Sequence, residues 1–194
     1  MNYIYPDSND ACNKLFATQY GYRFWYEEER LLLDKLKCYL QREAISTLMI
    51  DVGCGEGRLL PFFVPLFTRI ICVEPDIKRL TVANSLVSTL NGIQVEFHCG
   101  YVPNIQLDCK ADFIFCSHVL QHVPTTLVKP FINWLANHLD KGGCVWLAFE
   151  KSTSSHSRFC ISLGNGNSLF VNENNTIERQ AKKMCSPPTE FQLN

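Results

Sequence analysis

The sequence predicts an α/β fold built on a doubly wound, mostly parallel sheet. Short apolar runs alternate with helix-like stretches between residues 47 and 150. The runs are continuous, as expected for strands that are covered on both faces. Alternation of this kind favours βαβ units with right-handed crossovers. With 194 residues, the chain is long enough to build one sizeable hydrophobic core.

Each element follows from local patterning. Apolar residues at Leu32, Leu36 and Leu40 recur near the helical period, so residues 1–46 are expected to form a helical segment ahead of the sheet. Residues 47–194 are expected to form one domain. Strands are predicted at 47–52, 69–74, 94–98, 111–116 and 144–150, and helices near 57–67, 76–91 and 125–139.

Turn and cap residues refine these bounds. Pro65 should shorten or kink the first crossover helix. Thr125 or Thr126 is a plausible N-cap for the last helix, and Gly142-Gly143 suits its C-terminal cap. From about residue 151 the tail is atypical, with brief strand-like pieces at 158–163 and 169–171.

Composition narrows the functional class. The net charge of −1 gives no bulk attraction to nucleic acid or to an acidic membrane. The most apolar run, 59–67, is too short to span a bilayer, and the first ten residues lack the features of a secretory signal. The ten cysteines include no C-x-x-C pair, so they are expected to be free thiols in a reducing, intracellular setting, either cytoplasmic or nuclear.

A glycine-rich turn carries the main functional signal. The predicted strand 48–52 runs into Gly53-Cys54-Gly55-Glu56-Gly57, and such a turn at the carboxyl end of a first strand is where open α/β sheets bind ligands. Arg58 stands where a dinucleotide-binding motif has its third glycine, which counts against an oxidoreductase. Asp51 suits a cationic neighbour better than a phosphate. Glu74, at the end of the second strand, is placed to accept hydrogen bonds from ribose hydroxyls.

These segments resemble the class I S-adenosylmethionine (SAM)-dependent methyltransferases, in particular the type 11 branch, which includes enzymes similar to those of ubiquinone biosynthesis. The resemblance implies a Rossmann-like sheet that ends in an antiparallel hairpin. The tail of this chain shows no long strand patterns that could complete the sheet, so the C-terminal hairpin is expected to be incomplete. The matching segments, in order, are 51–58, 71–76, 111–123 and 139–143.

The resemblance implies SAM as cofactor and assigns its contacts. The methionine part would lie against the glycine turn and Asp51, the ribose against Glu74, and the adenine against Pro75 or Asp76. The N-terminal aromatic segment 20–26 would act as a lid over the cofactor. The implied cofactor-binding residues are Asp51, Gly53, Cys54, Gly55, Gly57, Glu74, Pro75, Asp76, Tyr101, Val102, Ser117, His118, Tyr22 and Arg23.

Two histidines are candidates for catalysis. His118 and His122 are four residues apart, and either could accept a proton from the methyl acceptor. A metal site with Cys116 is a weaker reading, and no metal is expected. Tyr101 stands where most relatives have an acid, so the resemblance implies that backbone groups would contact the adenine amine here.

The predicted reaction is direct displacement at the SAM methyl carbon, accelerated mainly by alignment of the reacting groups. A small molecule is the favoured acceptor, while protein and RNA acceptors stay open. No membrane partner is expected. The alternative is a non-catalytic methyltransferase-like subunit that binds a partner protein.

Overall fold

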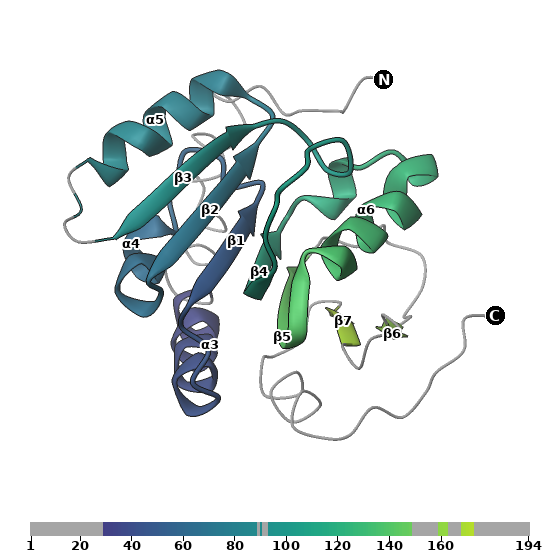
Figure 1. Ribbon diagram of the computed structural model, residues 1–194, viewed down its shortest axis with the longest axis horizontal. Helices are drawn as coiled ribbons and strands as arrows, with labels where there is room; N and C mark the ends of the chain where they lie inside the picture. The colour runs from purple at the N-terminus through teal and green to yellow at the C-terminus, as the bar shows by residue number, and fades with distance from the viewer. Residues whose placement is uncertain (1–28, 89, 91–92, 149–158, 163–167, 173–194) are drawn as a thin grey trace, which may run out of the picture.

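The computed structural model describes residues 29–88, 90, 93–148, 159–162 and 168–172. A seven-stranded sheet in the order β3-β2-β1-β4-β5-β7-β6 forms its centre (Figure 1). The strands are β1 (Leu48–Val52), β2 (Arg69–Glu74), β3 (Gln94–Cys99), β4 (Ala111–Ser117), β5 (Leu139–Ala148), β6 (Phe159–Ser162) and β7 (Ser168–Asn172). The helices are α3 (Glu29–Arg42), α4 (Leu60–Phe63), α5 (Ile77–Val87) and α6 (Thr125–Asn137), with 3-10 turns η2 (Val64–Leu66) and η3 (Leu120–His122).

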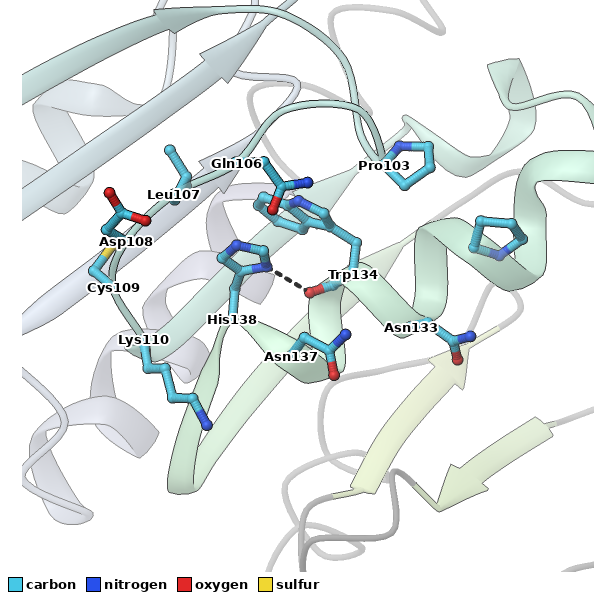
Figure 2. A pocket seen from close by; sticks show the side chains of 11 residues that line it. Pro103, Gln106, Leu107, Asp108, Cys109, Lys110, Asn133, Trp134, Asn137 and His138 are labelled. Atoms are coloured by element: carbon cyan, nitrogen blue, oxygen red, sulfur yellow. Dashed lines mark hydrogen bonds between the residues drawn. The ribbon is translucent and has the colours of Figure 1, made fainter.

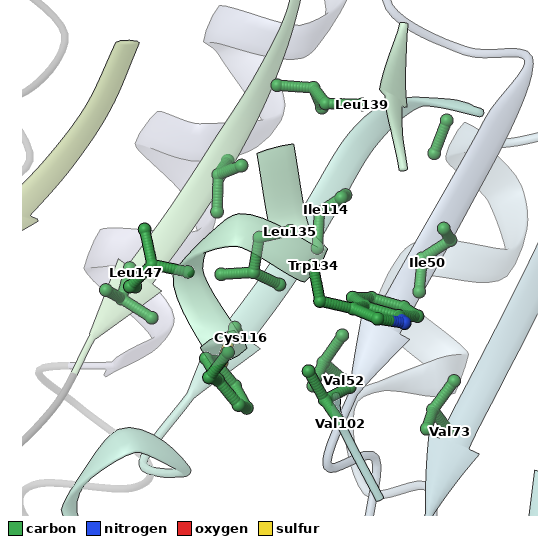
Figure 3. Close-up of a cluster of buried hydrophobic side chains, with 14 of the residues drawn as sticks. Ile50, Val52, Val73, Val102, Ile114, Cys116, Trp134, Leu135, Leu139 and Leu147 are labelled. Atoms are coloured by element: carbon green, nitrogen blue, oxygen red, sulfur yellow. The ribbon is translucent and has the colours of Figure 1, made fainter. Parts of the chain in front are cut away.

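The first five strands are all parallel to their neighbours, which confirms the predicted doubly wound sheet. Alternate strand residues pack on opposite faces of this sheet. On one face, Ile50 and Val52 lie in a cluster with Trp134 and Leu135 of α6 (Figure 3). On the other, α3, α4 and α5 cover the sheet through a second cluster that includes Leu36, Phe63 and Ala83. Burial on both faces explains why β1, β2 and β4 are mostly apolar.

The first crossover helix is short, as Pro65 predicts. α4 ends at Phe63, and the chain continues as the 3-10 turn η2. Pro65 has no N–H with which to continue the α-helical pattern. The 3-10 turn therefore connects α4 to β2 without a longer crossover helix.

The predicted cap of the last helix is wrong. α6 ends at Asn137, and Gly142 and Gly143 lie inside β5, where the register jumps from Ala111↔Leu139 to Phe113↔Cys144. A Cβ on Gly143 would come within 2.9 Å of the Asp112 carbonyl oxygen, so this bulge needs a glycine. The N-cap prediction is also wrong, because Pro124 occupies that position and Thr125 is the first helical residue.

The terminal hairpin is present but short. β6 and β7 have four and five residues and pair antiparallel. β7 pairs parallel with β5, so β6 is the antiparallel edge of the sheet. The lid segment 20–26 and the tail beyond 172 lie outside the described residues. Among the helices of the described ranges, none combines the length and apolar character needed to cross a membrane.

Candidate functional site

The glycine turn lies where the strand order reverses. β1 and β4 are neighbours in the sheet. The chain passes from β1 to β2 on one side of this pair and from β4 to β5 on the other side. Gly53 follows β1, and its N–H donates to the Val73 carbonyl at 2.7 Å. His118 follows β4 with a φ of 58°, and its N–H donates to the Ala148 carbonyl at 2.7 Å. The two turns therefore flank the crevice at which open α/β sheets bind ligands.

The three glycines of the turn have different roles. All have positive φ values, of 76°, 57° and 77° in order. A Cβ on Gly53 would lie 2.3 Å from Val119 Cγ2, and one on Gly57 would lie 2.8 Å from Leu60 Cδ1 and 3.0 Å from the Cβ of Ala83. A Cβ on Gly55 would meet nothing within 4 Å. Gly53 and Gly57 thus allow close packing, whereas the backbone at Gly55 faces open space.

This difference makes a testable pair of variants. Gly57→Ala is expected to destabilise the fold by about 2 kcal/mol, because the left-handed backbone and the crowding each cost ~1 kcal/mol. Gly55→Ala has only the backbone penalty and should lose about 1 kcal/mol. Urea unfolding of both variants measures this difference, and equal losses would contradict the assignment of Gly57 to packing.

Glu74 connects the turn to the next helix. Its carboxylate is almost fully buried. Oε2 accepts the Gly55 N–H at 3.0 Å, and Oε1 accepts the Asp76 N–H at 3.1 Å. These donors hold the carboxylate beside the open space at Gly55.

Asp51 is a second buried carboxyl group on the same face of the sheet. Burial, and then the neighbouring Glu74, raise the pKa of Asp51 to about 7, while the Arg58 guanidinium lowers it. Asp51 therefore changes charge near neutral pH, in the first strand of the crevice. A cation bound nearby would favour its charged form.

Cys54 contributes its backbone to the turn, but its thiol packs toward the core. The side chain lies against the cluster that contains Cys72. A hydrogen bond with the Cys72 thiol, together with burial, raises the pKa of Cys54. Burial likewise raises the pKa of Cys116. Such thiols are poor nucleophiles. The cysteines at positions 38, 54, 72, 99, 109, 116 and 144 are free, as predicted.

The expected adenine side consists of Pro75, Asp76, Tyr101 and Val102. The Asp76 side chain caps α5 by accepting the Lys78 N–H at 2.8 Å. Tyr101 is exposed, whereas Val102 is 2% exposed and packs with Val52 and Val73 in the core (Figure 3). Any contact of Val102 with a ligand would therefore come from its backbone.

The remaining expected residues divide into two groups. Ser117, His118 and His122 are partly buried and lie in or just after the end of β4. Tyr22 and Arg23 lie outside the described residues. Within the described part of the chain, no three His, Cys, Asp or Glu side chains gather as a metal ion would require.

An ion pair that the sequence did not indicate ties the turn to α3. Arg58 Nη1 donates to Glu29 Oε2 at 2.5 Å, and Nη2 donates to Oε1 at 2.8 Å. The two residues are 29 positions apart, and no local pattern relates them. Arg58 is therefore part of the site's support.

An open cavity of about 710 Å³ lies elsewhere, between segment 103–110 and the end of α6 (Figure 2). The Trp134 indole N–H donates to the Ile105 carbonyl at 2.7 Å, and the His138 ring stacks on the indole at 3.9 Å. None of the expected site residues that the structure describes lines this cavity. It is therefore distinct from the crevice at the glycine turn.

Comparison with known proteins agrees with this geometry. Residues 49–143 match the family model described as a methyltransferase domain. A ubiquinone biosynthesis O-methyltransferase of Nitrobacter winogradskyi is 27% identical over 95 residues, which is 49% of this chain and 35% of that protein. One from Rhodopseudomonas palustris is 28% identical over 100 residues, covering 52% and 38%. The match thus spans little more than a third of the length of these relatives.

Solved structures support the fold. A SAM-dependent methyltransferase of Clostridium acetobutylicum superposes with a TM-score of 0.61 at 18% identity, over 78% of this chain and 65% of that one. The N-methyltransferase NodS of Bradyrhizobium japonicum, in complex with S-adenosyl-L-homocysteine, gives 0.57 at 16% identity, over 73% and 72%. The family match covers residues 49–143, just under half of the chain, and these residues form a methyltransferase domain with the fold of known SAM-dependent methyltransferases.

Proposed function

We propose that the protein binds SAM in the crevice at the glycine turn and transfers its methyl group to a hydroxyl group of a small molecule. One observation carries this proposal. The buried Glu74 carboxylate is hydrogen-bonded to the Gly55 N–H, beside a turn position that faces open space. A fixed carboxylate next to an accessible backbone suits the ribose and methionine parts of SAM.

Different residues would hold different parts of the cofactor. Glu74 would accept hydrogen bonds from the ribose hydroxyls, and Asp51 would face the cationic methionine part. The backbone of the turn allows close approach, while Pro75, Asp76 and Tyr101 border the adenine side. Ser117 and His118, at the end of β4, would border the other side of the crevice. SAM supplies an electrophilic methyl group, and the protein would contribute mainly alignment and exclusion of water.

The acceptor class rests on the relatives, which are named as O-methyltransferases of ubiquinone biosynthesis. A hydroxyl acceptor must lose a proton during transfer, and His118 and His122 are the candidates to receive it. The positive φ of His118, together with its N–H bond to Ala148, holds that backbone in place at the crevice. His122 lies one 3-10 turn further along the chain.

Calorimetry with SAM, S-adenosylhomocysteine and NAD tests the cofactor. Binding of the first two without NAD is expected, and no binding of SAM would overturn the proposal. Labelled SAM is then incubated with separated small-molecule, protein and RNA fractions. Label is expected in the small-molecule fraction. Label in protein or RNA would contradict the acceptor class, and SAM binding without any transfer would favour the non-catalytic subunit that binds a partner protein.

A further inference from the structure

The backbone of Gly53 is covered by a side chain from the end of another strand. A Cβ built on Gly53 would lie 2.3 Å from Cγ2 of Val119, so the Val119 side chain fills the space that a larger residue at position 53 would need. Gly53 follows β1, whereas Val119 comes shortly after the end of β4. Val119 therefore connects the glycine turn directly to the segment that follows β4.

The segment after β4 begins with a left-handed residue. His118 has a φ of 58°, which is uncommon for a residue with a Cβ, and its N–H donates to the Ala148 carbonyl of β5 at 2.7 Å. Such conformations persist where the surrounding contacts hold them. Val119 comes next and precedes the 3-10 turn η3, and its carbonyl accepts the His122 N–H at 2.9 Å. The position of Val119 thus fixes the backbone of both candidate histidines.

The glycine turn is also held on its other side, by β2. The Gly53 N–H donates to the Val73 carbonyl at 2.7 Å, and the Gly55 N–H donates to the Glu74 carboxylate at 3.0 Å. Hydrogen bonds therefore fix the turn to β2, while the side chain of Val119 packs against it from the direction of β4. A change at Val119 can alter the spacing to β4 and leave the hydrogen bonds to β2 in place.

We propose that Val119 is a positioning residue for methyl transfer: packed on Gly53, it sets the distance between the turn that would hold SAM and the two histidines. The inference rests on the proposed function. Methyl transfer requires the acceptor, the methyl carbon and the sulfur to lie in line, and a misplacement of about 1 Å can cost about 100-fold in rate. Val119 acts through the spacing of the two segments, without contacting either reactant.

Val119→Ala tests this role in the full chain. The substitution removes both methyl groups that approach Gly53. We expect unchanged affinity for S-adenosylhomocysteine by calorimetry, but a rate of label transfer from saturating SAM to the small-molecule fraction that is about tenfold lower. Val119→Thr keeps the branched shape and should restore most of the rate. Val95→Ala is the matched control, because Val95 is also a partly buried valine but lies in β3.

A second measurement needs neither ligand nor acceptor. Gly53→Ala places a Cβ against Cγ2 of Val119 and should lower the melting temperature. In the Val119→Ala background Cγ2 is absent, and the nearest remaining atom of residue 119 is its Cβ at 3.5 Å, an ordinary contact. Gly53→Ala then adds only the strain of a left-handed backbone, so its effect on the melting temperature should be much smaller. Equal losses in both backgrounds would contradict the contact on which the inference depends.

The outcomes separate the inference from the proposed function. A wild-type rate of transfer in Val119→Ala would overturn the positioning role. Equal losses of rate in Val119→Ala and Val95→Ala would also overturn it, because they would reflect lost packing alone. If the wild type binds no S-adenosylhomocysteine, the proposed function falls and the role of Val119 with it, while the melting temperatures still show whether Val119 packs on Gly53.

Discussion

Replacing Glu74 with glutamine is expected to weaken SAM binding by about 100-fold. A hydrogen bond to a charged group contributes roughly 1.5–3 kcal/mol, and two such bonds to ribose hydroxyls would be lost or weakened. The amide also places an NH₂ group against the N–H of either Gly55 or Asp76, which now donate to the two carboxylate oxygens. The effect should therefore combine lost ligand contacts with a displaced turn. Calorimetry with SAM measures the affinity.

The matched control is Glu96→Gln on the neighbouring strand β3. Glu96 pairs with Arg69 at 2.7 Å, and both side chains are about one third exposed. Such exposed pairs contribute ~1 kcal/mol or less, so this variant should fold and bind SAM like the wild type. A folded Glu74→Gln protein with unchanged affinity would show that the ribose is held elsewhere.

The order of the helices and strands along the chain could be predicted, because strands that are buried on both faces have continuous apolar sequences. The apolar runs at 48–52, 69–74 and 111–117 are continuous, and each became a parallel strand. Pro65 acts through local backbone chemistry, so its effect on α4 was also predictable. These features need no knowledge of distant contacts.

The start of β5 could not be predicted for the opposite reason. Gly142-Gly143 after a helical stretch is typical of a C-terminal cap. The chain instead forms a bulge in β5 there, because β4 lies so close to Gly143 that a Cβ at this position would not fit. Only the tertiary structure distinguishes a glycine that ends a helix from one that admits a neighbouring strand.

Some parts of the candidate site could likewise be predicted from the sequence, and others could not. Gly53, Gly55, Gly57 and Glu74 are recognisable because the turn and the acid lie at fixed spacings along the chain. The ion pair of Arg58 with Glu29 depends on how α3 packs, and the burial of Val102 depends on the core above β1 and β2. Sequence patterns therefore located the crevice but not the groups that support it.

The contribution of Asp51 to the free energy of unfolding should fall as pH rises through the acidic range, and Asp51→Asn should remove this contribution. The pKa of Asp51 is about 7 in the folded protein against an ordinary 3.8. Between these values the folded state binds the proton and the unfolded state does not, so rising pH favours unfolding. One pKa unit corresponds to ~1.4 kcal/mol, which gives a penalty of about 4 kcal/mol once Asp51 is charged. Above neutral pH the penalty is constant.

Urea unfolding of the wild type and Asp51→Asn across this pH range measures the effect. The free energy of unfolding of the variant, relative to that of the wild type, should rise by about 1.4 kcal/mol per pH unit until neutral pH. Above neutral pH this difference should stay constant. Subtracting the two profiles removes the titrations that both proteins share. Asp108→Asn is the control, because that side chain is exposed and meets water in both states. A difference between wild type and Asp51→Asn that does not change with pH would mean that Asp51 is ionised throughout. Its charge would then be held by contacts stronger than the burial and the Glu74 repulsion that oppose it.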